Sequence, residues 1–272
     1  TESSPHSYTG MMSDPFFGRP VGLGGLAAAA LQARAWIEAS GAPARALAEV
    51  AAKNRTNGAR NPLAHLREAV SVEEVEASPV AASPLRTLEV SPASDGAAAM
   101  VVAVEERARE IHPRPVWIEG AGYSHDLAYP GHRNLARLKS CREASERAFR
   151  MARVRSAVRQ TNFAEVSECF AHQELMLYEA LGLAPAGEAA RFLDSGATRP
   201  DGDYPVNPSG GALCGDPGVA TGLARVGEVC LQLWRKAGAH QLEPAPTRGV
   251  AHAASGLAMQ SNLVYVLGTD RE

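Results

Sequence analysis

The sequence lacks several features that would point to specialised classes of protein. Its 272 residues carry 27 Lys and Arg against 30 Asp and Glu, and no basic stripe is interleaved with aromatic residues, which argues against a nucleic-acid-binding surface. No apolar run approaches the length that crosses a bilayer, and the N-terminus has no charged segment followed by an apolar one. We therefore expect no nucleic acid, no membrane and a cytoplasmic location.

Cysteine is also scarce. The four cysteines show no C-x-x-C spacing and are few for a chain of this length, which favours reduced thiols in a reducing compartment and argues against a structural zinc site; they are Cys141, Cys169, Cys214 and Cys230. We expect no bound metal. An apolar content of 45% with modest charge is typical of a globular protein with one large domain or two small ones.

The first part of the chain has a mainly helical pattern. Residues 1–20 are rich in Ser, Pro, Gly and aromatics and indicate an irregular arm, whereas apolar spacing predicts helices over residues 21–40 and 43–53. Residues 54–66 are predicted to be turn-rich. Residues 87–104 suggest a strand, a Ser-Asp-Gly turn and an Ala/Val-rich strand, and Glu105 begins a charged helix.

From residue 114 onward, predicted strands and helices alternate. The strands fall at residues 116–121, 163–168, 249–254 and 262–267, and the helices at 137–158, 171–181 and 219–237. This order predicts a layered α/β domain with a mixed sheet. The few strands near residues 87–104 cannot bury both faces alone, so we expect a partner or a further segment to complete their sheet.

The most informative stretch is NPSGGALCGDPGVATG, residues 207–222. Gly210 and Gly211 permit positive φ and a close approach of the backbone, and a second tight turn spans residues 215–218. The helix predicted from Val219 would direct its N-terminus at an oxyanion or a phosphate. The stretch therefore predicts backbone amides that line a ligand.

This stretch resembles the glycine-rich active-site loop of the thiolase superfamily, N-x-x-G-G…G-H-P-x-G-A-T-G, with Asp216 in place of the histidine. Four more segments match in the same order and extend the resemblance over essentially the whole chain. EVSECFAHQELMLYEALGL (165–183) is similar to the H-D-C-F segment of sterol-carrier-protein-type thiolases, and KNRTNGARNP (53–62), SDGAAAM (94–100) and HAASGLAMQSNLVYVLG (252–268) are similar to other segments of that family.

The resemblance implies a thiolase-like layered α/β/α fold with a mixed five-stranded sheet and an incomplete N-terminal half. Residues 114–272 would form the C-terminal domain, residues 1–66 a loop region that covers the substrate, and residues 67–113 a remnant of the N-terminal domain. Thiolases open with a βαβαβ segment that carries the nucleophilic cysteine, and the sequence has no such segment before Thr1. We expect either a processed or trimmed chain, or a missing half on another chain.

The H-D-C-F match implies roles for three residues. Cys169 would be the acid/base that moves a proton to or from the α-carbon of an acyl-CoA, although a small buried cysteine that only packs is the alternative. Ser167 takes the place of the family histidine that polarises the substrate carbonyl; its hydroxyl can donate a hydrogen bond but supplies no positive charge. Glu168 would brace the loop.

The two loop positions each leave an alternative open. Asp216 is either a general base or a cap on the helix predicted near residue 219. His252 matches the histidine of the family's closing loop, and its alternative is a structural histidine. Backbone contacts to the thioester, in two oxyanion holes, would come from Gly210, Gly211, Gly215, Ser255 and Gly256.

The implied function is an enzyme, or a subunit of one, that breaks or forms a carbon–carbon bond next to a coenzyme A thioester, with no covalently bound cofactor. Thiolysis of a 3-oxoacyl-CoA needs a cysteine nucleophile as well. The loss of both motif histidines makes a retro-aldol lyase, which would act on a steroid or branched side-chain acyl-CoA with an OB-fold companion, a serious alternative. A non-catalytic subunit is the third possibility, and we expect a homodimer, or a heteromer with that companion or a thiolase N-terminal chain.

Overall fold

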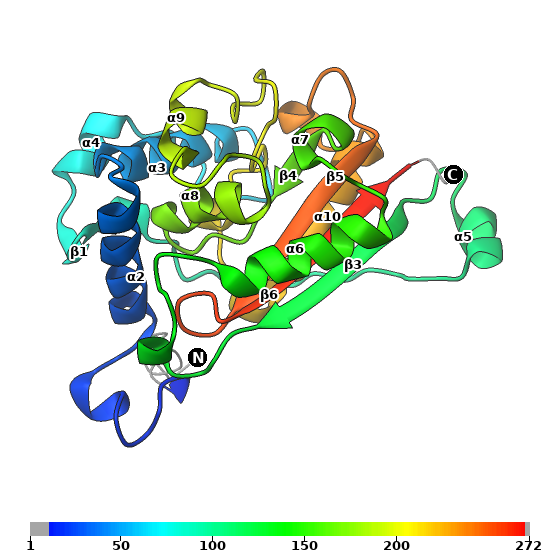
Figure 1. Ribbon diagram of the computed structural model, residues 1–272. Coiled ribbons are helices and arrows are strands. Elements are labelled where there is room, and N and C mark those ends of the chain that lie inside the picture. The colour runs from blue at the N-terminus through cyan, green and yellow to red at the C-terminus, as the bar shows by residue number, and fades with distance from the viewer. Residues whose placement is uncertain (1–10, 270–272) are drawn as a thin grey trace.

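The computed structural model describes residues 11–269 (Figure 1). Residues 11–90 contain η1 (Arg19–Val21), α2 (Gly25–Ser40), α3 (Arg45–Gly58), α4 (Val72–Ala77), β1 (Val80–Ala82), β2 (Leu85–Arg86) and η2 (Thr87–Glu89). The rest contains α5 (Glu105–Ile111), β3 (Trp117–His125), η3 (Pro130–His132), α6 (Lys139–Met151), α7 (Ala157–Gln160), β4 (Phe163–Glu165), α8 (Ala171–Ala180), α9 (Ala189–Asp194), η4 (Ala212–Cys214), η5 (Gly218–Ala220), α10 (Thr221–Leu233), η6 (Gly238–His240), β5 (Arg248–Ser255) and β6 (Ser261–Gly268). Within residues 11–269, no helix combines the length and the apolar character needed to cross a bilayer.

The main sheet is mixed, with strand order β3-β6-β5-β4. β6 lies antiparallel to both of its neighbours, whereas β4 and β5 are parallel and pair Ala164 with Val250. A single bridge joins Ala164 to Val206 on the outer edge of β4. The predicted layered α/β fold is confirmed, but the described chain forms a sheet of four strands, with Val206 alone where a fifth would lie.

Helices cover both faces of the sheet. One face packs α6 and α8 against residues such as Val250 and Val264, and the other packs α10 against Ala251 and Leu267. α6 lies close to β3 because Gly122 has no side chain; a Cβ there would stand 1.9 Å from the Ala144 carbonyl oxygen. In Figure 1, the N-terminal helices α2, α3 and α4 stand beside α8, away from the sheet.

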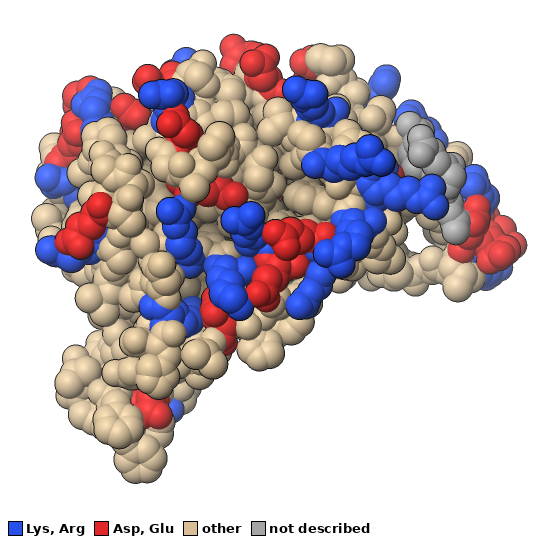
Figure 2. Space-filling view, viewed as in Figure 1, with Lys and Arg blue, Asp and Glu red and all other residues tan. Residues whose placement is uncertain are grey.

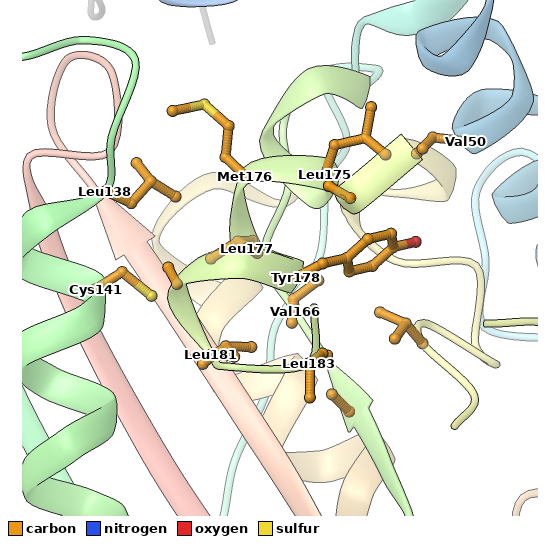
Figure 3. Close-up of a cluster of buried hydrophobic side chains, with 14 of the residues drawn as sticks. Val50, Leu138, Cys141, Val166, Leu175, Met176, Leu177, Tyr178, Leu181 and Leu183 are labelled. Atoms are coloured by element: carbon orange, nitrogen blue, oxygen red, sulfur yellow. The ribbon is translucent and has the colours of Figure 1, made fainter. Parts of the chain in front are cut away.

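α8 is the central helix of the core. Nine of its ten residues are buried, all but Glu179, which is expected of a helix that is covered on every side. Figure 3 shows its Leu175, Leu177 and Tyr178 among side chains from α3, α6 and the strand end at Val166. The helix begins two residues after Cys169, so the packed core restrains the position of that residue.

Two predicted segments before residue 114 differ from the structure. Residues 87–104 were expected to form two strands, but the chain forms the short turn η2 and then a stretch that, within residues 11–269, makes only the single bridges Val90 to Phe170 and Ala93 to Asp216 and no ladder. Residues 54–58, expected to be turns, belong to α3. The side chains of Asn54 and Asn57 donate hydrogen bonds to other segments, so they do not compete for the helix backbone.

A third difference lies after the strand β3. The helix predicted over residues 137–158 ends at Met151, and the chain resumes as the short helix α7. Arg153 has φ of +55°, a left-handed conformation that interrupts the helix. The remaining predicted helices and strands from residue 114 onward are present with shifted ends.

Candidate active site

The candidate site lies where the chain leaves β4 and enters α8. Val166 donates its amide to Asn207 Oδ1 at 2.7 Å, and Ser167 donates its amide to His252 Nδ1 at 3.4 Å. Cys169 follows, with its amide on Gln173 Oε1 at 3.1 Å. The chain after β4, His252 of β5 and Asn207 therefore meet here, whereas the predicted convergence of the turn after His252 on a ligand stays a prediction.

Cys169 as a whole residue is partly exposed, but its thiol is buried against the carboxylate of Asp216 and the hydroxyl of Ser91. Burial of the thiol, and next the negative charge of Asp216, raise the pKa of Cys169 well above its usual value. The thiol is therefore protonated at neutral pH. In this environment Cys169 can donate a proton but is a poor nucleophile.

Asp216 shows one of the two roles between which the sequence left a choice, that of a cap, whereas its role as a general base stays a prediction. Its Oδ1 accepts hydrogen bonds from Thr221 Oγ1 at 2.5 Å and from the Gly218 amide at 3.1 Å, so it caps the turn that leads into α10. Its Oδ2 accepts a hydrogen bond from Ser91 Oγ at 3.1 Å, on the side of the Cys169 thiol. One oxygen holds the turn, while the other accepts from Ser91, whose hydroxyl also lies against the Cys169 thiol.

A second segment, residues 91–94, completes the surroundings of Asp216. Ser94 and Asp216 exchange hydrogen bonds, from the Asp216 amide to Ser94 Oγ and from the Ser94 amide to the Asp216 carbonyl, both at 3.1 Å. Ser91 donates its amide to the Cys169 carbonyl at 2.8 Å, and His65 Nδ1 lies 2.9 Å from Ser94 Oγ. Sequence reasoning matched the Ser-Asp-Gly motif but missed these side chains. The sequence signal that could have indicated them is the pair of serines Ser91, shortly before the motif, and Ser94, its first residue.

His252 is buried and neutral. It is 1% exposed, and burial lowers the pKa of His252 to about 4. Because Nδ1 accepts the Ser167 amide, the hydrogen-bond network assigns the proton to Nε2, which donates to Asn262 Oδ1 at 2.9 Å. This geometry fits the structural alternative for His252. The hydroxyl of Ser167 is buried and has no hydrogen-bond partner among the described residues, so it is a free donor in this region.

The glycines predicted to line a ligand fall into two groups. Gly210 and Gly211 are buried, with φ of +98° and +67°, and a Cβ at Gly211 would lie 2.1 Å from Glu168 Oε1. Their lack of a side chain is explained by packing against α3 and Glu168. Gly215 borders His65 and Asp216, whereas Ser255 and Gly256 lie at the tip between β5 and β6. Ligand contact by any of the five stays a prediction.

Glu168 braces the glycine loop, as expected. Its buried carboxyl accepts hydrogen bonds from Asn54, from Asn207 at 2.7 Å and from the Leu213 amide. Burial, and next the neighbouring carboxylate of Glu174, raise the pKa of Glu168 to about 8. Glu168 therefore links α3 to the glycine loop at the back of the site.

The arrangement supplies an acid and a base in contact. A carboxylate fixed by three donors lies beside a protonated thiol, and the hydroxyl of Ser91 contacts both. Among the residues that the structure describes, no three His, Cys, Asp or Glu side chains are grouped as a metal site. A cavity of about 1320 Å³ lies elsewhere, between residues 99–112 and the sheet with α10, and does not include Cys169.

Comparison with known proteins identifies the family. A family model described as "Thiolase C-terminal domain-like" matches residues 122–269. Acetyl-CoA acetyltransferase of Methanothermobacter thermautotrophicus is 37% identical over 229 residues, which are 84% of this chain and 59% of the relative. Benzoylsuccinyl-CoA thiolase subunit BbsB of Thauera aromatica is 30% identical over 229 residues, with the same coverage. The chain thus spans little more than half the length of these relatives.

The fold has a counterpart among solved structures. The structure titled "Ltp2-ChsH2(DUF35) aldolase" superposes with a TM-score of 0.82 at 23% identity and covers 93% of this chain and 66% of its own. At this level of identity the likeness supports the fold. The family match over residues 122–269, together with the relatives at 30% identity or more, shows that the chain belongs to the thiolase family.

Proposed function

We propose that the chain is a carbon–carbon lyase of the retro-aldol type, or the catalytic subunit of one, that acts on a β-hydroxyacyl-CoA. The observation that carries this proposal is the contact between the Asp216 carboxylate, which can only accept a proton, and the protonated thiol of Cys169. A retro-aldol cleavage needs one base and one acid and no nucleophile. Both groups are present on this chain.

The reaction would proceed as follows. Asp216 accepts the proton of the β-hydroxyl, the O–H electron pair forms the new carbonyl, and the Cα–Cβ bond breaks to leave an enolate on the thioester. Cys169 then donates its proton to the α-carbon, which yields a shorter acyl-CoA and a ketone or aldehyde. Asp216 then passes the proton that it took to the Cys169 thiolate, because the high pKa of Cys169 favours the thiol form. This transfer restores both groups to their starting states. The cycle balances without a cofactor.

Thiolysis of a 3-oxoacyl-CoA is the second candidate, because the two relatives are named as an acetyltransferase and a thiolase subunit. A thiolase needs a readily ionised cysteine nucleophile. In this chain burial raises the pKa of all four cysteines, to about 12 for Cys214 and about 11 for Cys230. Thiolysis would therefore require a nucleophile other than the four cysteines of this sequence.

The partners follow from the same proposal. We propose that the region 1–66, of which the structure describes residues 11–66, covers the acyl-CoA, since His65 is hydrogen-bonded to Ser94 beside Asp216. We propose a homodimer or a heteromer with an OB-fold companion or a thiolase N-terminal chain. The match to a structure titled as a complex and to a relative named as a subunit supports the heteromer.

Two variants test the roles. Asp216→Asn and Cys169→Ala should each lower the rate of β-hydroxyacyl-CoA cleavage by about 10²-fold or more, the usual contribution of a general acid or base. Asp201→Asn, which changes an exposed carboxylate of a surface turn, should leave the rate unchanged. Thiolysis of a 3-oxoacyl-CoA with free CoA is assayed in parallel. Cleavage that survives both site variants would overturn the lyase proposal, and inactivity of the wild-type complex would favour a structural subunit.

A further inference from the structure

A short segment, residues 90–94, lies beside both candidate catalytic groups. Near its start, next to an antiparallel bridge, the Ser91 amide donates to the Cys169 carbonyl at 2.8 Å. Near its end, Ala93 forms a parallel bridge with Asp216. Side chains that lie opposite each other across an antiparallel pair are neighbours. The segment therefore places the Ser91 side chain next to that of Cys169 and close to the Asp216 backbone.

The hydroxyl of Ser91 has one proton and contacts two groups that can accept it. It donates to Asp216 Oδ2 at 3.1 Å, and it also lies against the Cys169 thiol. The Ser91 amide already anchors the segment through the Cys169 carbonyl. Pro92 follows directly and restricts the Ser91 backbone to an extended conformation. The hydroxyl is therefore not needed to hold the segment, and its two contacts call for another explanation.

The charges that act on the Cys169 thiol are negative. The charged groups with the strongest effect on it are the carboxylates of Asp216 and Glu168, and both disfavour the thiolate. The Lys and Arg side chains that gather over α6 in Figure 2 are not among these groups. The Ser91 hydroxyl acts in the opposite direction, because its hydrogen bond favours the thiolate. This hydroxyl takes the place that a cation usually has beside a reactive cysteine.

We propose that Ser91 is a positioning residue of the lyase reaction, whose hydroxyl turns from the Asp216 carboxylate to the Cys169 thiolate once Asp216 has taken the proton of the substrate. This inference rests on the proposed function. In the resting site the negative charge lies on Asp216, which accepts the hydroxyl proton. After the α-carbon has been protonated, Asp216 is neutral and the charge lies on the sulfur. A hydrogen bond to a charged group is about twice as strong as one between neutral groups, so the hydroxyl then donates to the thiolate.

The same contacts give a path for the last step, in which the proton returns from Asp216 to Cys169. The neutral Asp216 carboxyl donates its proton to Ser91 Oγ, and Ser91 donates its own proton to the sulfur. One O–H bond breaks on Asp216 and one S–H bond forms on Cys169, while Ser91 loses one proton and gains another. A hydroxyl is suited to this exchange because it donates and accepts at the same time. The step balances without an oxidant, a reductant or a cofactor.

The first test follows the ionisation of Cys169 and needs no turnover. Asp216→Asn replaces the carboxylate with a neutral group and so mimics the protonated state of Asp216. The ultraviolet absorbance of the thiolate, measured as the difference from the same protein with Cys169→Ala added, gives the pH at which the thiol is half-ionised. Adding Ser91→Ala should raise that pH by about one to two units, the effect of one hydrogen bond to a charged group. Adding Ser91→Thr, which keeps the hydroxyl, should leave it unchanged.

The second test follows the cleavage of a β-hydroxyacyl-CoA. Ser91→Ala should lower kcat by at least ~10-fold and change KM by less than ~2-fold, because the hydroxyl acts on the acid and the base and not on the bound substrate. Ser91→Thr should restore most of the rate. Ser91→Val has the shape of threonine without its hydroxyl, so it repeats the alanine test at matched size. The control is Ser195→Ala, which removes an exposed hydroxyl that donates to the Phe192 carbonyl at 2.8 Å, and its kcat should equal that of the wild type.

The outcomes separate the role of Ser91 from the proposed function. A half-ionisation pH that does not depend on the Ser91 hydroxyl would overturn the inference, whether or not the protein cleaves the substrate. Equal behaviour of Ser91→Thr and Ser91→Val would also overturn it, because size and not the hydroxyl would then decide the rate. If the pH depends on the hydroxyl but the wild type cleaves no β-hydroxyacyl-CoA, the lyase function fails and the hydrogen bond to the thiolate stands.

Discussion

The substitution Gly211→Ala tests whether the glycine loop is built for packing. Gly211 has φ of 67° and ψ of −165°. A residue with a side chain adopts this conformation only at a cost of ~1–3 kcal/mol. The new Cβ would also lie 2.1 Å from Glu168 Oε1. Moving that buried carboxyl breaks its bonds to Asn54 and the Leu213 amide, and an unsatisfied buried group costs ~1–3 kcal/mol.

We therefore expect Gly211→Ala to lower the free energy of unfolding by about 2 to 6 kcal/mol, a large part of the ~5–15 kcal/mol typical of a domain. Urea denaturation followed by circular dichroism measures the change. The matched control is Gly227→Ala in α10, where a Cβ would meet nothing within 4 Å. This substitution should raise the free energy of unfolding by ~0.4–1 kcal/mol. A Gly211→Ala protein that unfolds within ~0.5 kcal/mol of the wild type, a change usual for neutral surface sites, would refute the packing explanation.

Two further predictions concern buried ionisable groups. Lys53→Met leaves the buried Glu174 without the ammonium group that lies 2.6 Å away, so urea denaturation should show a free energy of unfolding lower by ~3–5 kcal/mol. Adding Glu174→Gln removes the unpaired charge and should recover part of that loss. A double variant with no recovery would contradict a charge effect. His252 has a folded-state pKa of about 4 against ~6.5 unfolded, so it contributes stability above pH ~6.5 that is lost as the pH falls toward 4. His252→Asn should therefore make the unfolding free energy less dependent on pH in this window, and an unchanged pH dependence would argue against a buried neutral histidine.

The sequence predicted local structure better than it predicted contacts between distant segments. The alternation of predicted strands with predicted helices located the strands β3 to β6 and the helix α8. These elements have clear apolar patterns because helices cover both faces of the sheet. The strand predicted within residues 87–104 has no ladder, since a strand depends on a neighbour that its own pattern does not contain. The helix α3 runs further than predicted because Asn54 is bonded to residues more than 100 positions away.

The candidate site shows the same division. Motif position identified Cys169, Asp216 and the strand end at Ser167, and the structure brings them together. The sequence could not assign Asp216 to one role, because each of its two oxygens has a different set of partners. Ser91 was missed because its bond to Asp216 joins residues 125 positions apart.

That separation has a consequence for how the protein acquires its site. The contacts around Asp216 and His252 link stretches 125, 122 and 85 residues apart, so none of them can form in an early, locally ordered state of the chain. We expect the thiol environment to mature only in the last phase of refolding. Proteolytic cleavage that separates residues 91–94 from Asp216 should abolish this environment of the Cys169 thiol, while most of the secondary structure persists.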